Sequence, residues 1–258
     1  MRHAWSESIK GAVRPAVFKL ARPGAAKFRC PICRYYGPMK SKRMSREPDV
    51  VRLHSKCPKC AATERHRAQS LFFDEWLPAA DSASKSFLHV APERCLQDRL
   101  REAFGTYHTT DLFRTDVDYQ EDLQSMSFAD ASYDVVFVSR VLTIPPDLGA
   151  CVREMRRVLK PGGVAIVSEC YYHETTQPDP NPKSEATRSF GVDLLDLFRE
   201  HFGRVETVTS DRFPQEYQLI NRVVRDGRPF DEVPEIVREP GAGMRELLVL
   251  AYADASSA

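Results

Sequence analysis

From Ser86 onward, short apolar runs alternate with amphipathic stretches, and this alternation limits the fold more than any other feature of the chain. The periodicity predicts strands at residues 87–91, 106–110, 133–139, 164–170, 205–209 and 247–253, and helices at 95–104, 147–159 and 192–202. Strands that alternate with helices over about 170 residues build a mostly parallel sheet with helices on both faces. The predicted fold class is therefore α/β, with a doubly wound sheet.

Acidic residues stand where two of these strands begin or end. In a parallel sheet, ligands bind at the carboxyl ends of the strands, where the strand order reverses. Asp111 ends the second predicted strand, where a carboxylate can accept hydrogen bonds from both hydroxyls of a ribose. Asp122 precedes the third strand and can accept a hydrogen bond from an adenine amino group. The order and spacing of the two carboxylates favour a nucleoside ligand.

Two C-P-x-C pairs precede the alternating region, Cys30–Cys33 and Cys57–Cys60. Two such turns let four thiolates converge on one ion, and zinc accepts a tetrahedral set of four sulfur ligands. A module of this size buries little core, so the metal must supply much of its folding free energy. We predict structural zinc in a zinc-ribbon-like module, held by Cys30, Cys33, Cys57 and Cys60. An iron site with the same ligands, or four unconnected cysteines, are the alternatives.

Charge is divided unevenly along the chain. The net charge is +1, but residues 1–67 hold 17 Lys and Arg against 4 Asp and Glu, and the remainder has a net charge of −12. A basic unit attracts anions, and basic residues mixed with aromatic ones make nucleic acid a candidate partner. Docking on the acidic part of the same chain is the alternative. The relevant residues are Tyr35, Tyr36, Lys40, Lys42, Arg43, Arg46 and Arg52.

Composition excludes several classes of protein. The hydrophobic fraction is 42% and the charged fraction is 28%, as in soluble globular proteins. No apolar run approaches the roughly 20 residues of a membrane-spanning helix, so we expect no membrane span. The N-terminus shows no export signal, so we expect a cytoplasmic protein with reduced cysteines.

These patterns divide the chain into four parts. We predict a basic segment at 1–29, the zinc-ribbon-like module at 30–67, a connecting helix and linker at 68–85, and the α/β domain at 86–258. Apolar positions at helical spacing between Ala61 and Leu77 predict the connecting helix. An insert at 175–188, rich in proline and polar residues, is a candidate lid. The sequence assigns neither a role to residues 211–245 nor an oligomeric state.

Residues 86–210 resemble the class I S-adenosylmethionine-dependent methyltransferases. The residues that carry the resemblance are Asp111, Asp122, the stretch 128–134, Val141-Leu142 and the stretch 154–163. Residues 30–210 are also similar to a bacterial subgroup that joins a paired C-P-x-C module to this domain. That similarity lies in Arg65-His66-Arg67, the run 88–93 and Phe190-Gly191-Val192-Asp193. The resemblance implies a Rossmann-like fold, S-adenosylmethionine as cofactor and methyl transfer as activity.

The resemblance further implies cofactor contacts from His89, Ala91, Glu93, Asp111, Leu112, Asp122, Leu123 and Ser139. The chain departs from the family at Ala91-Pro92-Glu93, where relatives have a glycine-rich loop. Glycine lets the backbone approach the methionine part of the ligand, so in this chain Ala91 must allow that approach. Glu93 is the candidate for binding the amino group of the methionine part. A second departure is Thr143-Ile144, which replaces a polar pair that relatives often place near the acceptor.

The methyl group of S-adenosylmethionine is already activated, so the protein mainly has to align it with the acceptor. A hydroxyl acceptor also needs a base, for which His173 is the candidate; a polar loop residue is the alternative reading of His173. Arg140 is the candidate for orienting an anionic acceptor. We expect O-methylation of a small molecule or a glycan. RNA methylation with the basic module gripping phosphate, or a non-catalytic binding protein on the same fold, are the alternatives.

Overall fold

The structure is a computed structural model of the chain, which describes residues 13, 15–43, 50–179, 184–225, 228–229, 233–240 and 243–254. The chain forms two compact units. The first unit comprises Met1–Phe73, Ser210–Asp231 and Arg238–Glu246. The second comprises Asp74–Thr209, Glu232–Val237 and Leu247–Ala258.

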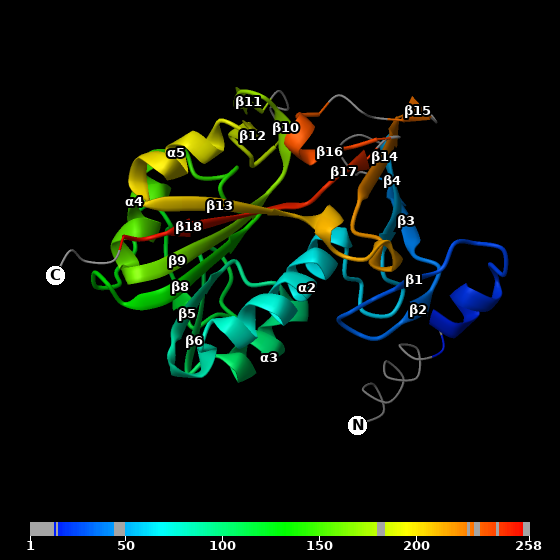
Figure 1. The fold of residues 1–258 in the computed structure, drawn as a ribbon, viewed down its shortest axis with the longest axis horizontal. Helices are drawn as coiled ribbons and strands as arrows, with labels where there is room; N and C mark the ends of the chain where they lie inside the picture. The colour runs from blue at the N-terminus through cyan, green and yellow to red at the C-terminus, as the bar shows by residue number, and fades with distance from the viewer. Residues whose placement is uncertain are drawn as a thin grey trace. The chain divides into compact units, whose positions relative to one another are not determined.

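In the described part of the chain, the second unit is built on a seven-stranded sheet with the order β13-β18-β9-β8-β5-β6-β7 (Figure 1). The strands are β5 (Ser86–Val90), β6 (Thr106–Asp111), β7 (Tyr119–Gln120), β8 (Tyr133–Ser139), β9 (Leu159–Glu169), β13 (Arg204–Thr209) and β18 (Leu247–Tyr252). β18 is antiparallel to both of its neighbours, and the other pairs are parallel. The predicted α/β class with a mostly parallel sheet is therefore confirmed.

The predicted strand bounds agree closely with the structure except at β9. This strand begins at Leu159 rather than Val164, because Leu159 already pairs with Tyr133 of β8. Strand β7 was not predicted, since its two exposed residues carry no apolar pattern.

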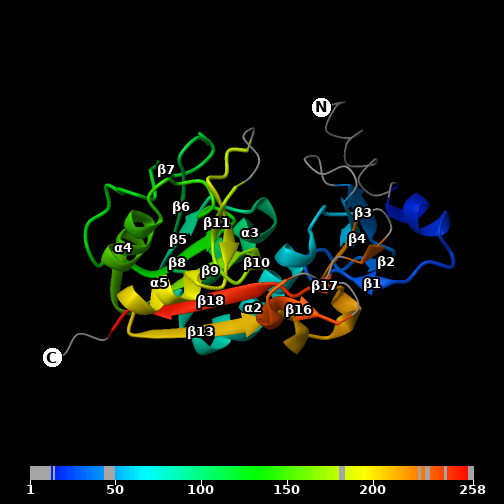
Figure 2. The same cartoon turned by 90° about the horizontal axis from the view of Figure 1, so that it is seen from above.

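Helices cover both faces of this sheet. The helices that connect its strands are α3 (Arg94–Ala103), α4 (Leu148–Val158) and α5 (Leu194–His201). The chain winds outward from β5 in both directions, so right-handed crossovers place α3 and α4 on opposite faces. Figure 2 shows β6 and β7 at one edge of the sheet and β13 at the other. The winding direction reverses between β5 and β8, and the carboxyl ends of the strands beside this point form the expected ligand-binding edge.

A small sheet with the order β10-β12-β11 follows the carboxyl end of β9. Its strands are β10 (Tyr171–His173), β11 (Gln177–Pro178) and β12 (Arg188–Gly191). A side chain at Gly191 would clash with the backbone of Thr175, and Asp193 accepts a hydrogen bond from the Thr176 N–H at 2.9 Å. The motif at 190–193 therefore holds the insert against the start of α5. Residues 180–183 of the predicted lid lie outside the described residues.

The first unit contains the cysteine pairs and two sheets. β1 (Phe28–Arg29) pairs with β2 (Tyr36–Gly37), and the larger sheet has the order β16-β17-β14-β4-β3 with β15 beside β14. The strands of the larger sheet are β3 (Lys40–Arg43), β4 (Val50–Lys56), β14 (Asn221–Arg225), β15 (Arg228–Pro229), β16 (Arg238–Glu239) and β17 (Gly243–Met244). Short 3₁₀ helices occupy Ser82–Ser84, Ser210–Arg212, Gln215–Tyr217 and Glu235–Val237 of the chain.

The position of residues 210–246 differs from the predicted boundaries. The sequence analysis assigned them to the α/β domain at 86–258, but most of the segment belongs to the first unit. The reason is strand pairing: β14 pairs antiparallel with β4, with Arg222 opposite Leu53 and Arg225 opposite Val50. The predicted basic segment 1–29 is described only at residue 13 and from Pro15 onward.

Helix α2 (Glu64–Ala79) carries the chain from the first unit into the second, and it overlaps the stretch 61–77 in which the apolar spacing predicts a helix. Its Arg67 guanidinium is fully buried and donates hydrogen bonds to four backbone carbonyl oxygens. The acceptors are Ser55 and Ala62 at 2.8 and 3.0 Å, and Tyr217 and Gln218 at 2.8 and 2.5 Å. One side chain therefore fastens residues 217–218 to the second cysteine pair. Arg67, from the Arg65-His66-Arg67 motif, has a structural role.

A buried ion pair reinforces this junction within the first unit. Glu64 pairs with Arg52 and accepts a hydrogen bond from the Ser55 hydroxyl at 2.7 Å. Burial by itself would raise the pKa of Glu64, but the neighbouring Arg52 guanidinium holds that pKa below its usual value. Arg52 is thus part of the fold of this unit. Tyr35 is also internal: its side chain is buried, and its hydroxyl donates a hydrogen bond to the Pro38 carbonyl oxygen at 3.1 Å.

Candidate functional site

The loop after β5 contains an alanine in a conformation that favours glycine. Ala91 has a φ of +49°, in the left-handed region. Its N–H donates to the Thr110 carbonyl oxygen at 2.7 Å, which ties the carboxyl end of β5 to that of β6. A left-handed L-residue costs about 1–2 kcal/mol, and such strain is retained only where the surroundings enforce it. Ala91 thus adopts a backbone geometry that glycine takes without steric cost.

Behind this loop lies a buried chain of hydrogen bonds. The fully buried His89 ring has its Nδ1 atom 2.7 Å from the Tyr107 hydroxyl and its Nε2 atom 2.9 Å from Glu93 Oε2. Burial raises the pKa of Tyr107 far above its usual value, so its hydroxyl keeps its proton. His89 thus links Tyr107 to Glu93 in one buried hydrogen-bonded chain. His89 has no exposed surface, and it reaches the site through Glu93.

Asp111 lies at the end of β6, where its Oδ1 atom shapes the next loop. That atom accepts the N–H groups of Phe113 and Arg114 at 2.8 and 3.0 Å. Arg114 then donates to the Pro92 carbonyl oxygen at 2.8 Å, which joins the loops after β5 and β6. Its hydrogen bonds to Asp116 lower the pKa of that exposed carboxyl to about 2. Within the described residues Asp111 Oδ2 accepts no hydrogen bond, so it is open to a ligand hydroxyl.

Asp122 lies at the same edge of the sheet. Strand β7 pairs parallel with β6, with Asp111 opposite Gln120, so Asp122 follows the carboxyl end of the neighbouring strand. Its Oδ1 and Oδ2 atoms accept from the Gln124 backbone N–H at 2.9 Å and side-chain amide at 3.0 Å. Leu123 is buried, whereas Leu112 beside Asp111 is 47% exposed. The two carboxylates predicted to hold a nucleoside therefore follow adjacent strands, with Asp122 already bound by Gln124.

The loop after β8 is shaped by a buried carboxylate, Glu169, which the strand pattern places at the carboxyl edge of the sheet without assigning it a role. Arg140 has a φ of +59° and follows the buried Ser139. The next two N–H groups, of Val141 and Leu142, donate to Glu169 Oε1 at 2.8 and 3.0 Å. Glu169 is itself buried at the end of β9. An acidic residue that ends an otherwise apolar strand was the signal for this role.

The insert after β10 is attached to the same loop through Arg188, which the sequence analysis missed. Its guanidinium donates to the carbonyl oxygens of Leu142, Pro145 and Pro146 at 2.8, 2.6 and 2.7 Å. The Thr187 N–H donates to the Thr143 carbonyl at 2.7 Å. These bonds hold the described part of the insert at the carboxyl edge of the sheet.

His173 belongs to β10, which pairs with β12 of the insert. Its Nε2 atom lies 3.1 Å from the Ser189 hydroxyl oxygen. The ring is partly exposed, and β10 follows the carboxyl end of β9. Both predicted catalytic residues, Arg140 and His173, therefore follow the ends of adjacent central strands.

The four cysteines of the two pairs form one cluster. Their Sγ atoms all lie within 4.8 Å of one another, with Cys30–Cys60 and Cys33–Cys57 both at 3.6 Å. Four sulfur atoms at about 2.3 Å from one zinc ion in a tetrahedron lie roughly 3.8 Å apart. The cluster therefore has the donor chemistry and the dimensions of a zinc site.

The backbone makes the same turn at both cysteine pairs. The N–H of the residue after each pair donates to the carbonyl of its first cysteine, Arg34 to Cys30 at 2.9 Å and Ala61 to Cys57 at 3.0 Å. Arg34 and Ala61 both have a positive φ. The two pairs are thus matching knuckles that aim their thiols at one point.

The structure separates the basic and aromatic residues of the first unit into two groups. Tyr35 is buried and Arg52 is paired with Glu64, so both belong to the fold. Arg46 lies outside the described residues. The exposed members are Tyr36, Lys40, Lys42 and Arg43.

Comparison with known proteins agrees with the topology. Residues 84–167 match a family model described as a methyltransferase domain. An arsenite methyltransferase of Aquipseudomonas alcaligenes is 43% identical over 53 residues, 20% of this chain and 15% of that protein. A polyketide synthase-nonribosomal peptide synthetase of Aspergillus clavatus is 34% identical over 77 residues, 30% of this chain and 2% of that protein. The chain thus spans only a small part of the length of these curated relatives.

Solved structures of methyltransferases are similar to this chain at low sequence identity. A putative methyltransferase of Bacillus halodurans has a TM-score of 0.46 and 18% identity, covering 70% of this chain and 98% of its own. The 1,6-didemethyltoxoflavin-N1-methyltransferase of Burkholderia thailandensis, with bound S-adenosylhomocysteine, has a TM-score of 0.49 and 15% identity, covering 74% and 78%.

The stretch that matches the methyltransferase domain, residues 84–167, lies within the second unit. The mostly parallel sheet of this unit has a Rossmann-like strand order. The chain as a whole joins this domain to a four-cysteine unit whose sulfur cluster is compatible with zinc. In the described ranges, no helix has both the length and the apolar character that crossing a membrane requires.

The strained loop yields a stability prediction. Ala91→Gly should raise the free energy of unfolding by roughly 0.5–1 kcal/mol, because glycine adopts a positive φ without the steric cost. The same substitution in the interior of helix α2, Ala68→Gly, should lower it by roughly 1 kcal/mol or more, because glycine costs conformational entropy there and removes a buried methyl group. Urea unfolding of the full chain, followed by circular dichroism, measures both. Equal destabilisation by the two variants would contradict the strain at Ala91.

Proposed function

We propose that the chain transfers the methyl group of S-adenosylmethionine to a hydroxyl group of a small molecule or a glycan. The observation that carries this proposal is the pairing of a methyltransferase domain with an available carboxylate oxygen, Asp111 Oδ2, at the reversal point of its sheet. S-adenosylmethionine supplies an activated methyl group when bound.

The residues at the ends of β5 and β6 fit the methyl donor. Asp111 accepts the ribose hydroxyls, and Leu112 and Phe113, 47% and 76% exposed, offer apolar surface beside that carboxylate for an adenine ring. Asp122 and Leu123 bind the adenine edge, and Ser139, at the end of β8, is a further contact to the donor. Glu93, held by His89, accepts from the amino group of the methionine part, and Ala91 allows the backbone to approach it.

The residues at the ends of β8 and β9 serve the acceptor. His173 removes the hydroxyl proton, and the Ser189 hydroxyl at 3.1 Å orients its ring. Arg140 orients an acidic group of the acceptor. Ile144 is 37% exposed in the loop after β8, so the acceptor side presents an apolar surface that suits a small organic molecule. The insert held by Arg188 acts as a lid over this side.

A second candidate function is RNA methylation, favoured by the exposed basic face of the first unit. All four residues of β3, Lys40 to Arg43, are exposed. The exposed Tyr36 ring has the Arg29 guanidinium 5.1 Å from its centroid. A basic surface with an aromatic ring suits a single strand. A binding protein without catalysis is the third candidate.

We also propose that the four-cysteine cluster holds structural zinc. All four donors come from the protein, so the ion has no open coordination position and takes no part in methyl transfer. A cytoplasmic location belongs to the same proposal, supported by the free state of all seven cysteines.

The donor site is tested through Asp111. Asp111→Asn keeps the Oδ1 acceptor of the turn but removes the charge, so binding of S-adenosylmethionine should weaken roughly ten- to a hundredfold. Isothermal titration calorimetry measures the affinity. Asp98→Asn, the same change on the exposed surface of α3, is the control and should bind normally. Wild-type affinity in Asp111→Asn would overturn the donor site.

The base is tested through His173. Removing it by His173→Ala should lower turnover by about 10²–10⁴-fold, because the hydroxyl proton of the acceptor loses the group that removes it. The assay follows labelled methyl transfer to a panel of hydroxyl-bearing small molecules and glycans. His201→Ala on α5 is the matched control. Unchanged turnover of His173→Ala across the pH range would exclude His173 as the base.

The metal site is tested by elemental analysis. The purified chain should contain one zinc ion, and Cys30→Ser or Cys57→Ser should lose it, because three thiolates hold zinc far less tightly than four. Cys95→Ser, outside the cluster, should retain the full zinc content. A strong chelator should also unfold the first unit. Zinc-free wild-type protein with an intact fold would refute a structural metal.

A further inference from the structure

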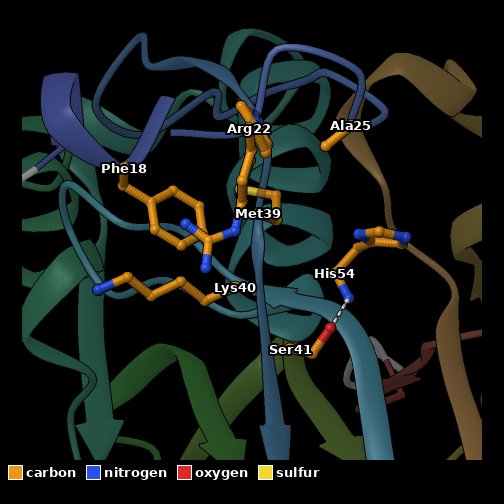
Figure 3. Close-up of a pocket in the computed structure, with 8 residues that line it drawn as sticks. Phe18, Arg22, Ala25, Met39, Lys40, Ser41 and His54 are labelled. Carbon is orange, nitrogen blue, oxygen red and sulfur yellow. Dashed lines mark hydrogen bonds between the residues drawn. The ribbon is translucent and has the colours of Figure 1, made fainter. Parts of the chain in front are cut away.

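A pocket of about 520 Å³ opens in the first unit, beside the described helical residues 15–20 and the strands β3 and β4 (Figure 3). This volume falls in the range of sites that hold a nucleotide-sized ligand. The residues that matter for recognition are Phe18, Arg22, Met39, Lys40, Ser41 and His54. None of the functions assigned to the cysteine cluster uses this pocket.

One side of the pocket carries two cations, Arg22 and Lys40, that form no ion pair with any residue the structure describes. The Arg22 guanidinium lies 4.0 Å and the Lys40 ammonium 5.4 Å from the centroid of the Phe18 ring. Cation–π attraction to one ring holds both groups in place. Among the described residues neither forms an ion pair, and the described lining contains no acidic side chain. This side of the pocket can therefore bind an anion through its two cations.

The other side of the pocket is polar but uncharged. Figure 3 shows the His54 ring across the pocket from Phe18. Burial and the neighbouring Arg222 lower the pKa of His54, so its neutral ring offers one donor and one acceptor. Its backbone N–H donates to Ser41 Oγ at 3.3 Å, which leaves the Ser41 hydroxyl proton for a ligand. Neighbouring donors and acceptors of this kind can form hydrogen bonds with the edge of a heterocyclic base.

The cationic character continues beyond the pocket. Lys42 and Arg43 extend it along the exposed strand β3. Tyr36, 47% exposed, has the Lys19 ammonium 5.6 Å from its ring centroid. Several cations spaced beside aromatic rings suit a series of phosphates better than a single one.

We propose that this pocket binds a nucleoside phosphate, with the phosphate between Arg22 and Lys40 and the base edge at His54 and Ser41. The cations along β3 favour a nucleotide within a single strand over a free nucleotide. The pocket deepens the second candidate function, but its binding does not depend on methyl transfer.

The experiment uses fluorescence anisotropy of the full chain with labelled ten-nucleotide RNA strands at low salt. Arg22→Glu and Lys40→Glu should each weaken binding at least tenfold and reduce the slope of log affinity against log salt by about one. Lys27→Glu changes an exposed lysine outside the lining by the same charge, and it should weaken binding less than threefold. His54→Leu should reduce discrimination between bases and leave the salt slope unchanged.

Competition distinguishes the sources of the ligand. If nucleoside monophosphates at micromolar concentration displace the labelled strand, and Arg22→Glu no longer binds them, the pocket is supported with a free nucleotide as its ligand. Equal weakening by Lys27→Glu and Arg22→Glu, or equal displacement by inorganic polyphosphate, would overturn it in favour of unspecific charge attraction. Absence of binding to strand and nucleotide at low salt would also overturn it. Calorimetry on the same samples measures the binding of S-adenosylmethionine. It therefore distinguishes a pocket that does not bind nucleotides from a donor site that does not bind S-adenosylmethionine.

Discussion

The candidate donor site depends on hydrogen bonds that hold the loops after β5 and β6 together. The Ala91 N–H reaches the Thr110 carbonyl, and Arg114 reaches the Pro92 carbonyl from the turn that Asp111 organises. These bonds keep Ala91 at a positive φ, which an alanine would otherwise leave. Asp111 Oδ1 accepts two N–H groups of its own loop, and its Oδ2 atom accepts none within the described residues. The loop after β5 is thus held by contacts from the next strand and the loop that follows it.

Two charged side chains, Glu169 and Arg188, hold the loop after β8 by its backbone. Glu169 receives the first N–H groups after Arg140, and Arg188 binds the carbonyl groups that follow. Together they clamp both ends of the loop after β8 with opposite charges. A loop held in this way can position its side chains, such as the partly exposed Ile144, without regular secondary structure of its own.

The charged side chains of the first unit are of two kinds: some are buried in its interior, and others lie on its surface. Arg52, Glu64 and Arg67 are buried or nearly so, and they satisfy each other and the backbone, which stabilises the unit around the cysteine knuckles. Arg22, Lys40 and Lys42 remain on its surface. The net charge of +13 over residues 1–67 is therefore larger than the positive charge on the surface of the unit, because part of that charge lies in its core.

The sequence by itself determined the elements of the α/β sheet, the four-cysteine set and the order of the acidic residues at the strand ends. Each of these depends on periodicity or spacing within a short stretch of chain, so local patterns are sufficient. Only the tertiary structure decided that residues 221–225 pair with β4, that Tyr35 and Arg52 are internal, and that Glu169 and Arg188 hold the loop after β8. These contacts join residues far apart in the chain, and no local pattern specifies which distant backbone group a side chain will meet.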